Sequence, residues 1–215
     1  VRSLLKISQK AYGYLSRQFV RISSLRPDDR GAITQHLQSL PERDRYFRFG
    51  FAATDKQIQS YVEGLNFERD HVYGIYNRQA NLVAVAHVAQ MSEQYQAPLS
   101  FGLGYSDRAE FGVSVLPAYR GKGYGGRLFD RAMTHARNQG ISQFHIQALT
   151  ENSRMLHIAK KRGATLVNYG SETEAHLLLP KADIDSRISE LMAEHFGNVD
   201  YVIAHKQNPH KALAL

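Results

Sequence analysis

The chain is 215 residues long with 43% hydrophobic and 10% aromatic residues, a composition that supports a packed domain and excludes global disorder. It contains no cysteine, which excludes disulfides, thiolate catalysis and zinc–thiolate sites and favours a cytoplasmic location. The net charge is +7, but lysines and arginines are scattered and no apolar run approaches the roughly 18 residues of a membrane helix, so neither nucleic acid nor a membrane is an expected partner.

The pattern of apolar residues divides the chain into three parts. Residues 1–18 form an N-terminal extension with a helical pattern. Lys6, Lys10 and Arg17 interrupt its apolar residues, so the segment is a poor secretion signal. Residues 19–180 form the main domain, and residues 181–215 form a C-terminal helical extension packed on it. The predicted strands are 19–25, 71–76, 82–90, 110–116, 143–149, 164–169 and 174–179. The predicted helices are 27–40, one capped by Thr54, one running to Gly140, 151–162 and 182–206, and residues 92–108 are expected to form a surface loop.

Residues 110–126 are the most informative part of the sequence. An apolar strand stops at Pro117, and glycines then occupy positions 121, 123, 125 and 126 at the start of an amphipathic helix. Because glycine is disfavoured inside helices, four of them near one helix start need a reason. A loop without side chains can turn successive backbone N–H groups toward an anion, and the helix N-terminus adds partial positive charge. The segment therefore predicts a phosphate-binding loop.

Two familiar phosphate-binding loops fit this segment less well. A P-loop needs Ser or Thr after Gly-Lys to hold magnesium, and here Gly123 follows Lys122. A dinucleotide-binding fold carries Gly-x-Gly-x-x-Gly with an acidic residue about 20 positions further on. The glycines at 121, 123 and 126 fit that string, but a string this short is weak evidence.

The context of the glycines points to another class. The motif Arg120-x-x-Gly123-x-Gly125, after a strand that opens with Glu110 and ends in Pro117, resembles the pyrophosphate-binding motif of the GNAT superfamily of acyl-CoA-dependent N-acetyltransferases. The order of predicted elements from about residue 19 to residue 179 also resembles this superfamily. The resemblance implies an α/β (α+β) fold with a mixed, largely antiparallel central sheet flanked by helices, carrying N- and C-terminal helical additions. It also implies acetyl-CoA as the cosubstrate.

The resemblance further assigns residues that contact coenzyme A. The main chain of Val113 and Val115 would pair with the pantetheine arm as an added strand would, and a backbone N–H of this strand would meet the thioester oxygen. Asn152 would contact the cofactor, although a plain helix cap is the alternative. The pyrophosphate would be held by Arg120, Gly121, Lys122, Gly123, Tyr124, Gly125 and Gly126.

Glu110 is the candidate general base for deprotonating an amine. Strict alternation along the strand places it on the face of Gly112 and Ser114, opposite Phe111, Val113 and Val115. In several GNAT members, including bacterial protein lysine acetyltransferases, a glutamate at this point has that role. The alternative is a solvent-exposed glutamate at the end of a strand.

One position departs from the family pattern. Many members carry a tyrosine four residues before the glycine that ends the last core helix, and this tyrosine protonates the departing thiolate. Here Ala159 stands four residues before Gly163. Ser114 is taken as the catalytic replacement, with Tyr124 and His157 as alternatives. A further alternative is that no acid is needed, because a thiolate is a tolerable leaving group.

The segment 40–49, followed by Ala109-Glu110-Phe111, resembles most closely the acyltransferase domain of bacterial protein lysine acetyltransferases. It implies that Tyr46, Arg48 and Phe49 line the acceptor site, with core packing as the alternative for Phe49.

The sequence thus predicts transfer of an acetyl group from acetyl-CoA to a primary amine, of a protein lysine or of a small molecule, by direct attack on the thioester. The alternative is a regulatory domain that binds acyl-CoA with little or no turnover, which Ala159 favours and Glu110 opposes. No metal is expected, because the ten histidines form no metal-binding signature. The sequence leaves the oligomeric state undecided, and a homodimer is one possibility.

Overall fold

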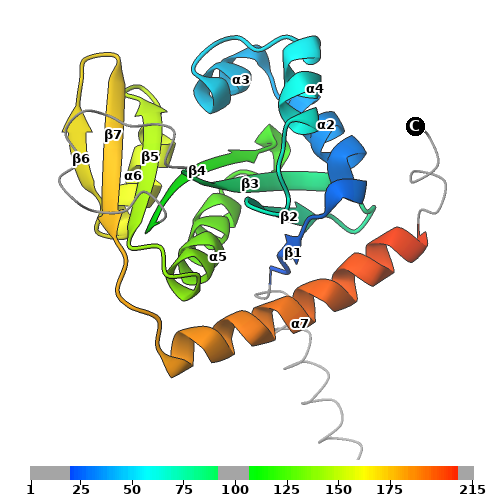
Figure 1. Cartoon of the computed structure of the whole chain (residues 1–215). Coiled ribbons are helices and arrows are strands. Elements are labelled where there is room, and N and C mark those ends of the chain that lie inside the picture. Colours follow the sequence, from blue (N-terminus) through cyan, green and yellow to red (C-terminus); the bar gives the residue numbers. More distant parts are fainter. Residues whose placement is uncertain (1–19, 92–106, 208–215) are drawn as a thin grey trace, which may run out of the picture.

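The computed structural model describes residues 20–91 and 107–207, which form one central sheet with helices on both faces (Figure 1). The strand order is β1-β2-β3-β4-β5-β7-β6, and every neighbouring pair is antiparallel except the parallel pair β4–β5. The expected fold class, mixed and largely antiparallel, is therefore confirmed. The strands are β1 (Ser23–Ser24), β2 (His71–Tyr76), β3 (Leu82–Gln90), β4 (Arg108–Val115), β5 (Gln143–Leu149), β6 (Thr165–Asn168) and β7 (Glu172–Leu178).

The helices form two layers around this sheet. Helices α2 and α4 bury Ile33, Leu37, Ile58 and Val62 against β2 and β3, whereas α5 and α6 pack on the opposite face. The helices are α2 (Arg30–Gln38), α3 (Glu42–Phe49), α4 (Asp55–Glu63), α5 (Tyr124–Asn138), α6 (Ser153–Lys161) and α7 (Ile184–Gln207), with short 3-10 turns η1 (Pro27–Asp29) and η3 (Pro117–Tyr119). In the described part of the chain, no helix has the length and apolar character needed to cross a bilayer.

Three phenylalanines fix β4 and β5 to α5. The ring of Phe129 on α5 meets Phe111 of β4 at 4.9 Å and Phe144 of β5 at 5.5 Å between centroids, both edge-to-face. All three side chains are fully buried, and such pairs add about 0.5–1.5 kcal/mol each beyond the burial of their apolar area. This cluster holds the start of α5 against the strand that precedes it in sequence.

Most predicted elements are present, with three differences. Helix α3 was not predicted; its sequence, Glu42–Phe49, is strongly charged and none of its residues is fully buried, so it lacks the apolar stripe that marks a helix. The first strand is reduced to Ser23–Ser24, and β4 and β7 begin at Arg108 and Glu172, each two residues earlier than expected. The expectations for residues 1–18, and for nearly all of the surface loop 92–108, lie outside the described residues.

Helix α7 is held against α5 by a buried ionic network. The Glu190 carboxylate accepts hydrogen bonds from Arg131 (3.2 Å), Asn138 (2.6 Å) and His135 on α5. Burial alone would raise the pKa of Glu190, but the hydrogen bonds from His135 and Asn138 outweigh it and lower the pKa to about 2. The charged form of Glu190 therefore stabilises the docked helix.

We expect Glu190→Gln to lower the free energy of unfolding by about 2 kcal/mol near neutral pH, because it removes the charge from these hydrogen bonds. The folded-state pKa is depressed, so the wild-type contribution is complete above the unfolded value near 4.5 and is lost as pH falls toward about 2. Denaturant titrations at neutral and acidic pH measure both effects. Glu194→Gln is the control, because Glu194 is 45% exposed and lies 3.3 Å from Arg131, a weaker ion pair at the surface. Equal losses in the two variants would contradict the assignment.

Candidate active site

The parallel strands β4 and β5 separate halfway along β4. Their register comprises only Arg108–Gln143, Ala109–Phe144 and Glu110–His145, whereas the antiparallel pairing of β3 with β4 continues to Val115. In Figure 1 the two strands diverge from this point. The opening lies directly before the glycine-rich loop.

Main-chain groups of β4 face this opening in alternation. Two hydrogen bonds of 3.0 Å show which residues face β3. The N–H of Leu116 donates to the carbonyl of Val83, and the N–H of Met91 donates to the carbonyl of Arg108. Because backbone groups alternate along a strand, the even-numbered residues of β4 face β3 and the odd-numbered ones face the β5 side. The N–H and C=O groups of Val113 and Val115 therefore point into the opening, where an extended ligand can pair with them. The Val115 carbonyl already accepts a 3.2 Å hydrogen bond from Arg120 Nε.

The glycine-rich loop ends as the N-terminus of α5. Gly121 and Gly123 have φ of 73° and 77°, the left-handed region that side chains disfavour, and Gly123 is the N-cap. The N–H of Arg127 donates to the Gly123 carbonyl, so the N–H groups of Tyr124, Gly125 and Gly126 precede the first intrahelical bond. These N–H groups and the positive end of the α5 dipole, here called the cradle, offer the kind of environment that favours an anion.

Helix packing explains the next two glycines, Gly125 and Gly126, whereas the sequence suggested another reason. A Cβ on Gly125 would lie 3.1 Å from Ile158 of α6, and one on Gly126 would lie 2.9 Å from the Arg162 guanidinium. Arg162 donates to the Gly126 carbonyl at 2.7 Å and pairs with Asp130. These glycines let α5 and α6 pack closely, whereas close approach to an anion was the expected reason.

The side chains of the loop point away from the cradle or pack beside it. Arg120 forms an ion pair with Asp44 of α3, so its guanidinium ties the loop to that helix. The ammonium of Lys122 lies 4.8 Å from the Tyr119 ring centroid, and Tyr124 packs against the main core. The cradle is therefore formed mainly by main-chain groups.

Asn152 caps α6, as the alternative interpretation held. Its Oδ1 accepts a 3.3 Å hydrogen bond from the N–H of Met155. Its Nδ2 has no partner among the described residues and stays available to a ligand.

Ala159 is completely buried in the main core, while His157 is exposed on the same helix. A phenol at position 159 would have to displace core side chains. We therefore expect Ala159→Tyr to disturb the core rather than to supply an acid for the thiolate.

The opposite face of β4 carries Glu110, Gly112 and Ser114, as alternation predicted. Glu110 is exposed at the point where β4 and β5 separate. Arg48 of α3 lies over Gly112, where a Cβ would come within 2.8 Å of the guanidinium carbon. Gly112 is thus required for Arg48 to reach the strand.

Arg48 begins a chain of polar contacts that crosses to β2 and β3. Its Nη2 donates to the Tyr61 hydroxyl at 2.7 Å, and that hydroxyl lies 2.8 Å from His87 Nδ1. His87 Nε2 is 3.3 Å from Asp70, an ionic distance without hydrogen-bond alignment. Burial would raise the pKa of Asp70, but His87 and Arg69 lower it below its usual range, so Asp70 is charged. This series of polar contacts fixes the position of the Arg48 guanidinium from the side of α4 and β3.

The hydroxyl of Ser114 is bound to a buried histidine. His36 Nδ1 lies 3.1 Å from the Leu82 carbonyl, to which it must donate, so Nε2 accepts from Ser114 Oγ at 2.8 Å. Burial is the main cause that lowers the pKa of His36, to about 4, and nearby Arg48 adds to it. His36 is therefore neutral at physiological pH.

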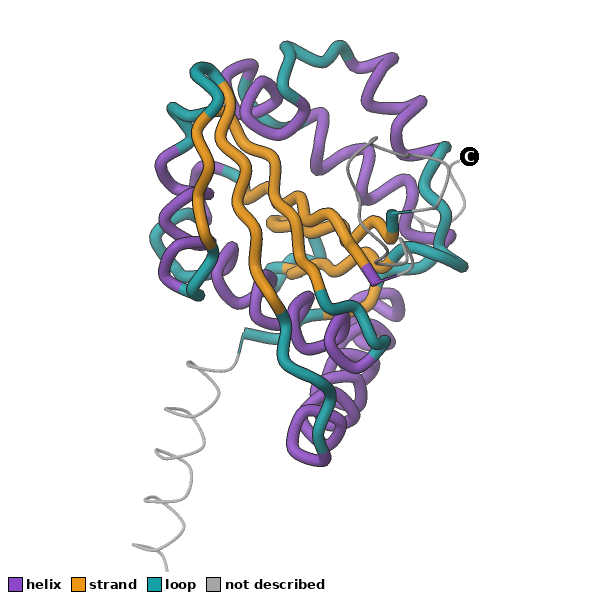
Figure 2. The backbone as a smooth tube through the Cα atoms, turned by 60° about the vertical axis from the view of Figure 1, so that its left-hand side comes forward, coloured by secondary structure: helices purple, strands orange, loops and turns teal. Residues whose placement is uncertain are grey.

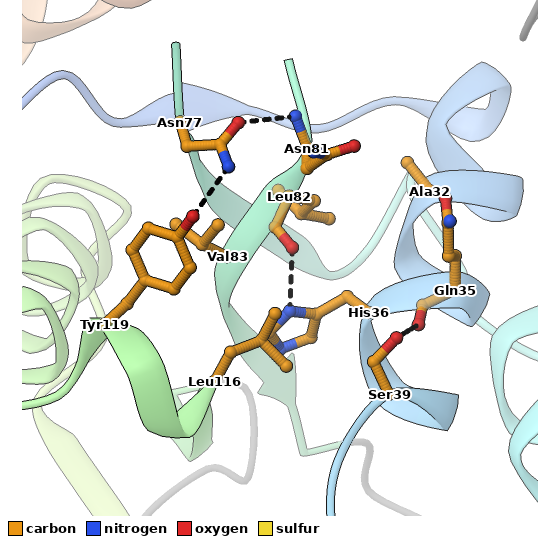
Figure 3. Close-up of a pocket in the computed structure, with 10 residues that line it drawn as sticks. All are labelled: Ala32, Gln35, His36, Ser39, Asn77, Asn81, Leu82, Val83, Leu116 and Tyr119. Atoms are coloured by element: carbon orange, nitrogen blue, oxygen red, sulfur yellow. Dashed lines mark hydrogen bonds between the residues drawn. The ribbon is translucent and has the colours of Figure 1, made fainter. Parts of the chain in front are cut away.

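Figure 3 shows His36 beside a hollow of about 280 Å³ between α2 and the turn that precedes the glycine loop. Tyr119 closes one side, and its hydroxyl accepts a 2.8 Å hydrogen bond from Asn77. The hollow lies next to the cradle on the α2 side of β4.

The three residues predicted to line the site of the amine acceptor lie in different environments. Phe49 packs edge-to-face on Tyr61 at 5.3 Å and joins the core beneath α2 and α4, as its alternative interpretation held. Tyr46 is 36% exposed on α3. Of the three, Arg48 alone lies against β4.

Sequence analysis missed His36, Tyr61, His87 and Asp70. They lie far from β4 in the chain, and no local spacing connects them to it. Only the helical spacing of Tyr61 with Ile58 and Val62 indicated that its side chain faces inward.

The fold and this site define a class of protein. Residues 20–165 match the family model described as acetyltransferase (GNAT) domain. The chain therefore belongs to the GNAT acetyltransferase family.

Solved structures share the fold at low identity. The GNAT domain of PAT from S. lividans aligns with a TM-score of 0.60 at 17% identity, over 74% of this chain and 89% of that chain. The yncA protein of Salmonella typhimurium, solved with acetyl-CoA, aligns with a TM-score of 0.54 at 18% identity, over 75% and 95%. Spermidine N-acetyltransferase of Vibrio cholerae, solved with CoA and spermine, aligns with a TM-score of 0.55 at 14% identity, over 73% and 94%.

Proposed function

We propose that this protein transfers an acetyl group from acetyl-CoA to a primary amine. The observation that carries this is the opening between β4 and β5 beyond Glu110, which leads directly to the cradle of N–H groups at the start of α5. An extended arm of CoA fits the opening by pairing with Val113 and Val115, and its pyrophosphate fits the cradle. Family membership and the CoA-bound neighbours support this reading.

The proposed reaction is direct attack of the amine on the thioester. Glu110, exposed where the strands separate, accepts the proton from the amine through water or directly. A backbone N–H of β4 that faces the opening donates to the thioester oxygen as negative charge develops on it. The tetrahedral intermediate then collapses, the C–S bond breaks, and CoA leaves as a thiolate that takes up a proton.

The acceptor would approach on the face of β4 that carries Glu110, with Arg48 and Tyr46 as its walls. Both a protein lysine and a small amine fit this proposal. The test is incubation with acetyl-CoA and a panel of lysine peptides, polyamines and amino acids, with free thiol and acetylated product both measured. Thiol release that needs an amine and yields acetylated amine supports the proposal. Tight acetyl-CoA binding without amine-dependent release would replace it by the second candidate.

The second candidate is a regulatory domain that binds acyl-CoA with little or no turnover. The buried Ala159 favours it, because the position at which many relatives carry a phenol here belongs to the core. The same assay separates the two candidates.

We propose that Ser114 assists protonation of the departing thiolate as a relay: its hydroxyl, which donates to His36 Nε2 in this structure, turns to donate to the sulfur while it takes up a proton from water. Ser114→Ala should lower turnover roughly 10-fold, below the usual range for general acids because a thiolate is a tolerable leaving group. It should also cost about 1–3 kcal/mol of stability, since Nε2 of buried His36 loses its partner. Turnover against pH and thermal unfolding separate the two effects. Ser39→Ala is the control, because the Ser39 hydroxyl bonds the Gln35 carbonyl on the exposed end of α2. Unchanged turnover at every pH would show that Ser114 is structural only.

A further inference from the structure

Two histidines and a glutamate meet on the face of the sheet formed by β5 and β7. His145 lies directly opposite His176 in the register, and Glu174 is two residues earlier on β7, so all three share one face. One ligand atom from each lies within 4.8 Å of the other two. These side chains are exposed or half-buried, and in Figure 2 this part of the sheet faces the viewer.

The separation of the two imidazoles suits a shared metal ion better than a hydrogen bond. His145 Nδ1 and His176 Nδ1 are 3.4 Å apart, longer than the roughly 2.7–3.2 Å of protein hydrogen bonds. Two nitrogens bound to a tetrahedral zinc ion at about 2.0–2.1 Å lie about 3.4 Å from each other. The strand register thus already sets the ligand spacing.

Glu174 completes the arrangement. Its Oε2 lies 3.2 Å from His176 Nε2, the ring nitrogen that points away from His145. Its carboxylate is also within reach of a shared ion, because one ligand atom from each of the three residues lies within 4.8 Å of the other two. Among the described residues, the only ion pair of Glu174 is with His176.

A second cluster in the described part of the chain, His135 with Glu190 and Glu194, already has other partners. Glu190 and Glu194 both pair with the Arg131 guanidinium, and His135 donates to Glu190. A cation there would have to displace arginine. By contrast, Glu174 forms no ion pair with an arginine or lysine in the described part of the chain.

We propose that His145, His176 and Glu174 bind a divalent transition-metal ion such as Zn²⁺. Imidazole nitrogen with one carboxylate suits zinc, copper or nickel, whereas magnesium and calcium prefer sites made of oxygen alone. The sequence did not indicate the site because its histidines are 31 residues apart and meet only through the β5–β7 pairing.

The site adjoins the proposed general base. Glu110 lies opposite His145 in the β4–β5 register, on the same face, and its charge acts on His145. On the basis of the proposed function, a bound cation attracts the Glu110 carboxylate and withdraws it from the amine. Zinc should therefore slow acetyl transfer reversibly.

The test is calorimetric titration of the full chain, without a histidine tag, with ZnCl₂. We expect one zinc ion per chain, and at least 10-fold weaker binding in His145→Asn, in His176→Asn and in Glu174→Gln. His157→Asn is the control, because His157 is exposed on α6, away from this face. MgCl₂ should give no binding at this site. Since His176 is exposed, its variant should fold even if the half-buried His145 variant does not.

Absence of zinc binding to the wild type, or equal binding by His176→Asn and His157→Asn, would overturn the site. In acetylation assays, zinc should inhibit the wild type, and a chelator should reverse this. His176→Asn should require at least 10-fold more zinc for the same inhibition. Zinc binding without inhibition would keep the site and reject its link to Glu110. A protein that binds zinc but never acetylates would reject the proposed function alone.

Discussion

Glu110→Gln should lower the turnover number for acetyl transfer by about 10²–10⁴-fold, the range for loss of a general base. Glutamine keeps the shape of the side chain but cannot accept the proton of the amine. Acetyl-CoA affinity should barely change, because Glu110 lies on the face of β4 opposite the main core, and the proposed cofactor contacts come from the main chain of Val113 and Val115 and from the α5 cradle. Steady-state kinetics across about pH 6–9, with calorimetry for acetyl-CoA, measure both quantities.

Glu68→Gln is the matched control for this change. Glu68 is also exposed, but it lies in the turn before β2, away from the opening. It should have wild-type turnover. If Glu110→Gln also turns over normally over the whole pH range, the base is another group or solvent.

Gly123→Val should weaken acetyl-CoA binding by about 10²-fold or more. Gly123 is the N-cap of α5 with a φ of 77°, so valine forces the loop away from the geometry that aims the N–H groups at one point. Losing even one or two hydrogen bonds to a charged phosphate, at about 1.5–3 kcal/mol each, accounts for a loss of this size. Calorimetric titration with acetyl-CoA, alongside thermal unfolding, measures the effect.

Gly140→Val controls for the conformational strain itself. Gly140 follows the other end of α5 with a φ of 82° and open space around its Cβ position. It should lose similar stability yet bind acetyl-CoA as the wild type does. Gly125→Val tests a different cause, because its Cβ meets Ile158 and the substitution separates α5 from α6. Wild-type affinity in Gly123→Val would refute the cradle.

Local patterns predicted the parts of the site that lie within one segment of chain. The strand, the glycines and the helix between residues 110 and 138 are contiguous, so their alternation and spacing carry the geometry directly. The face of Glu110 and the cap formed by Asn152 were both readable in this way. Helix α3 was missed because its charged sequence buries no side chain fully, and helix periodicity can be read only where one face is buried.

Contacts between distant segments decided the rest. Ser114 meets His36 across 78 residues, and Arg48 reaches Gly112 only because α3 folds over β4. The same glycine-rich string contained two kinds of glycine: positive φ explains Gly121 and Gly123, and helix packing explains Gly125 and Gly126.

The sequence by itself determined the fold class and the position of the glycine-rich loop before the main helix, because periodicity, glycine spacing and capping are local and leave a mark in consecutive residues. The tertiary structure alone decided which polar groups share a site: His36 with Ser114, Arg48 with Tyr61 and His145 with His176. The physical reason is that strand register sets the distance between His145 and His176, and that the packing of helices on the sheet sets the other two distances. Both result from the burial of apolar side chains.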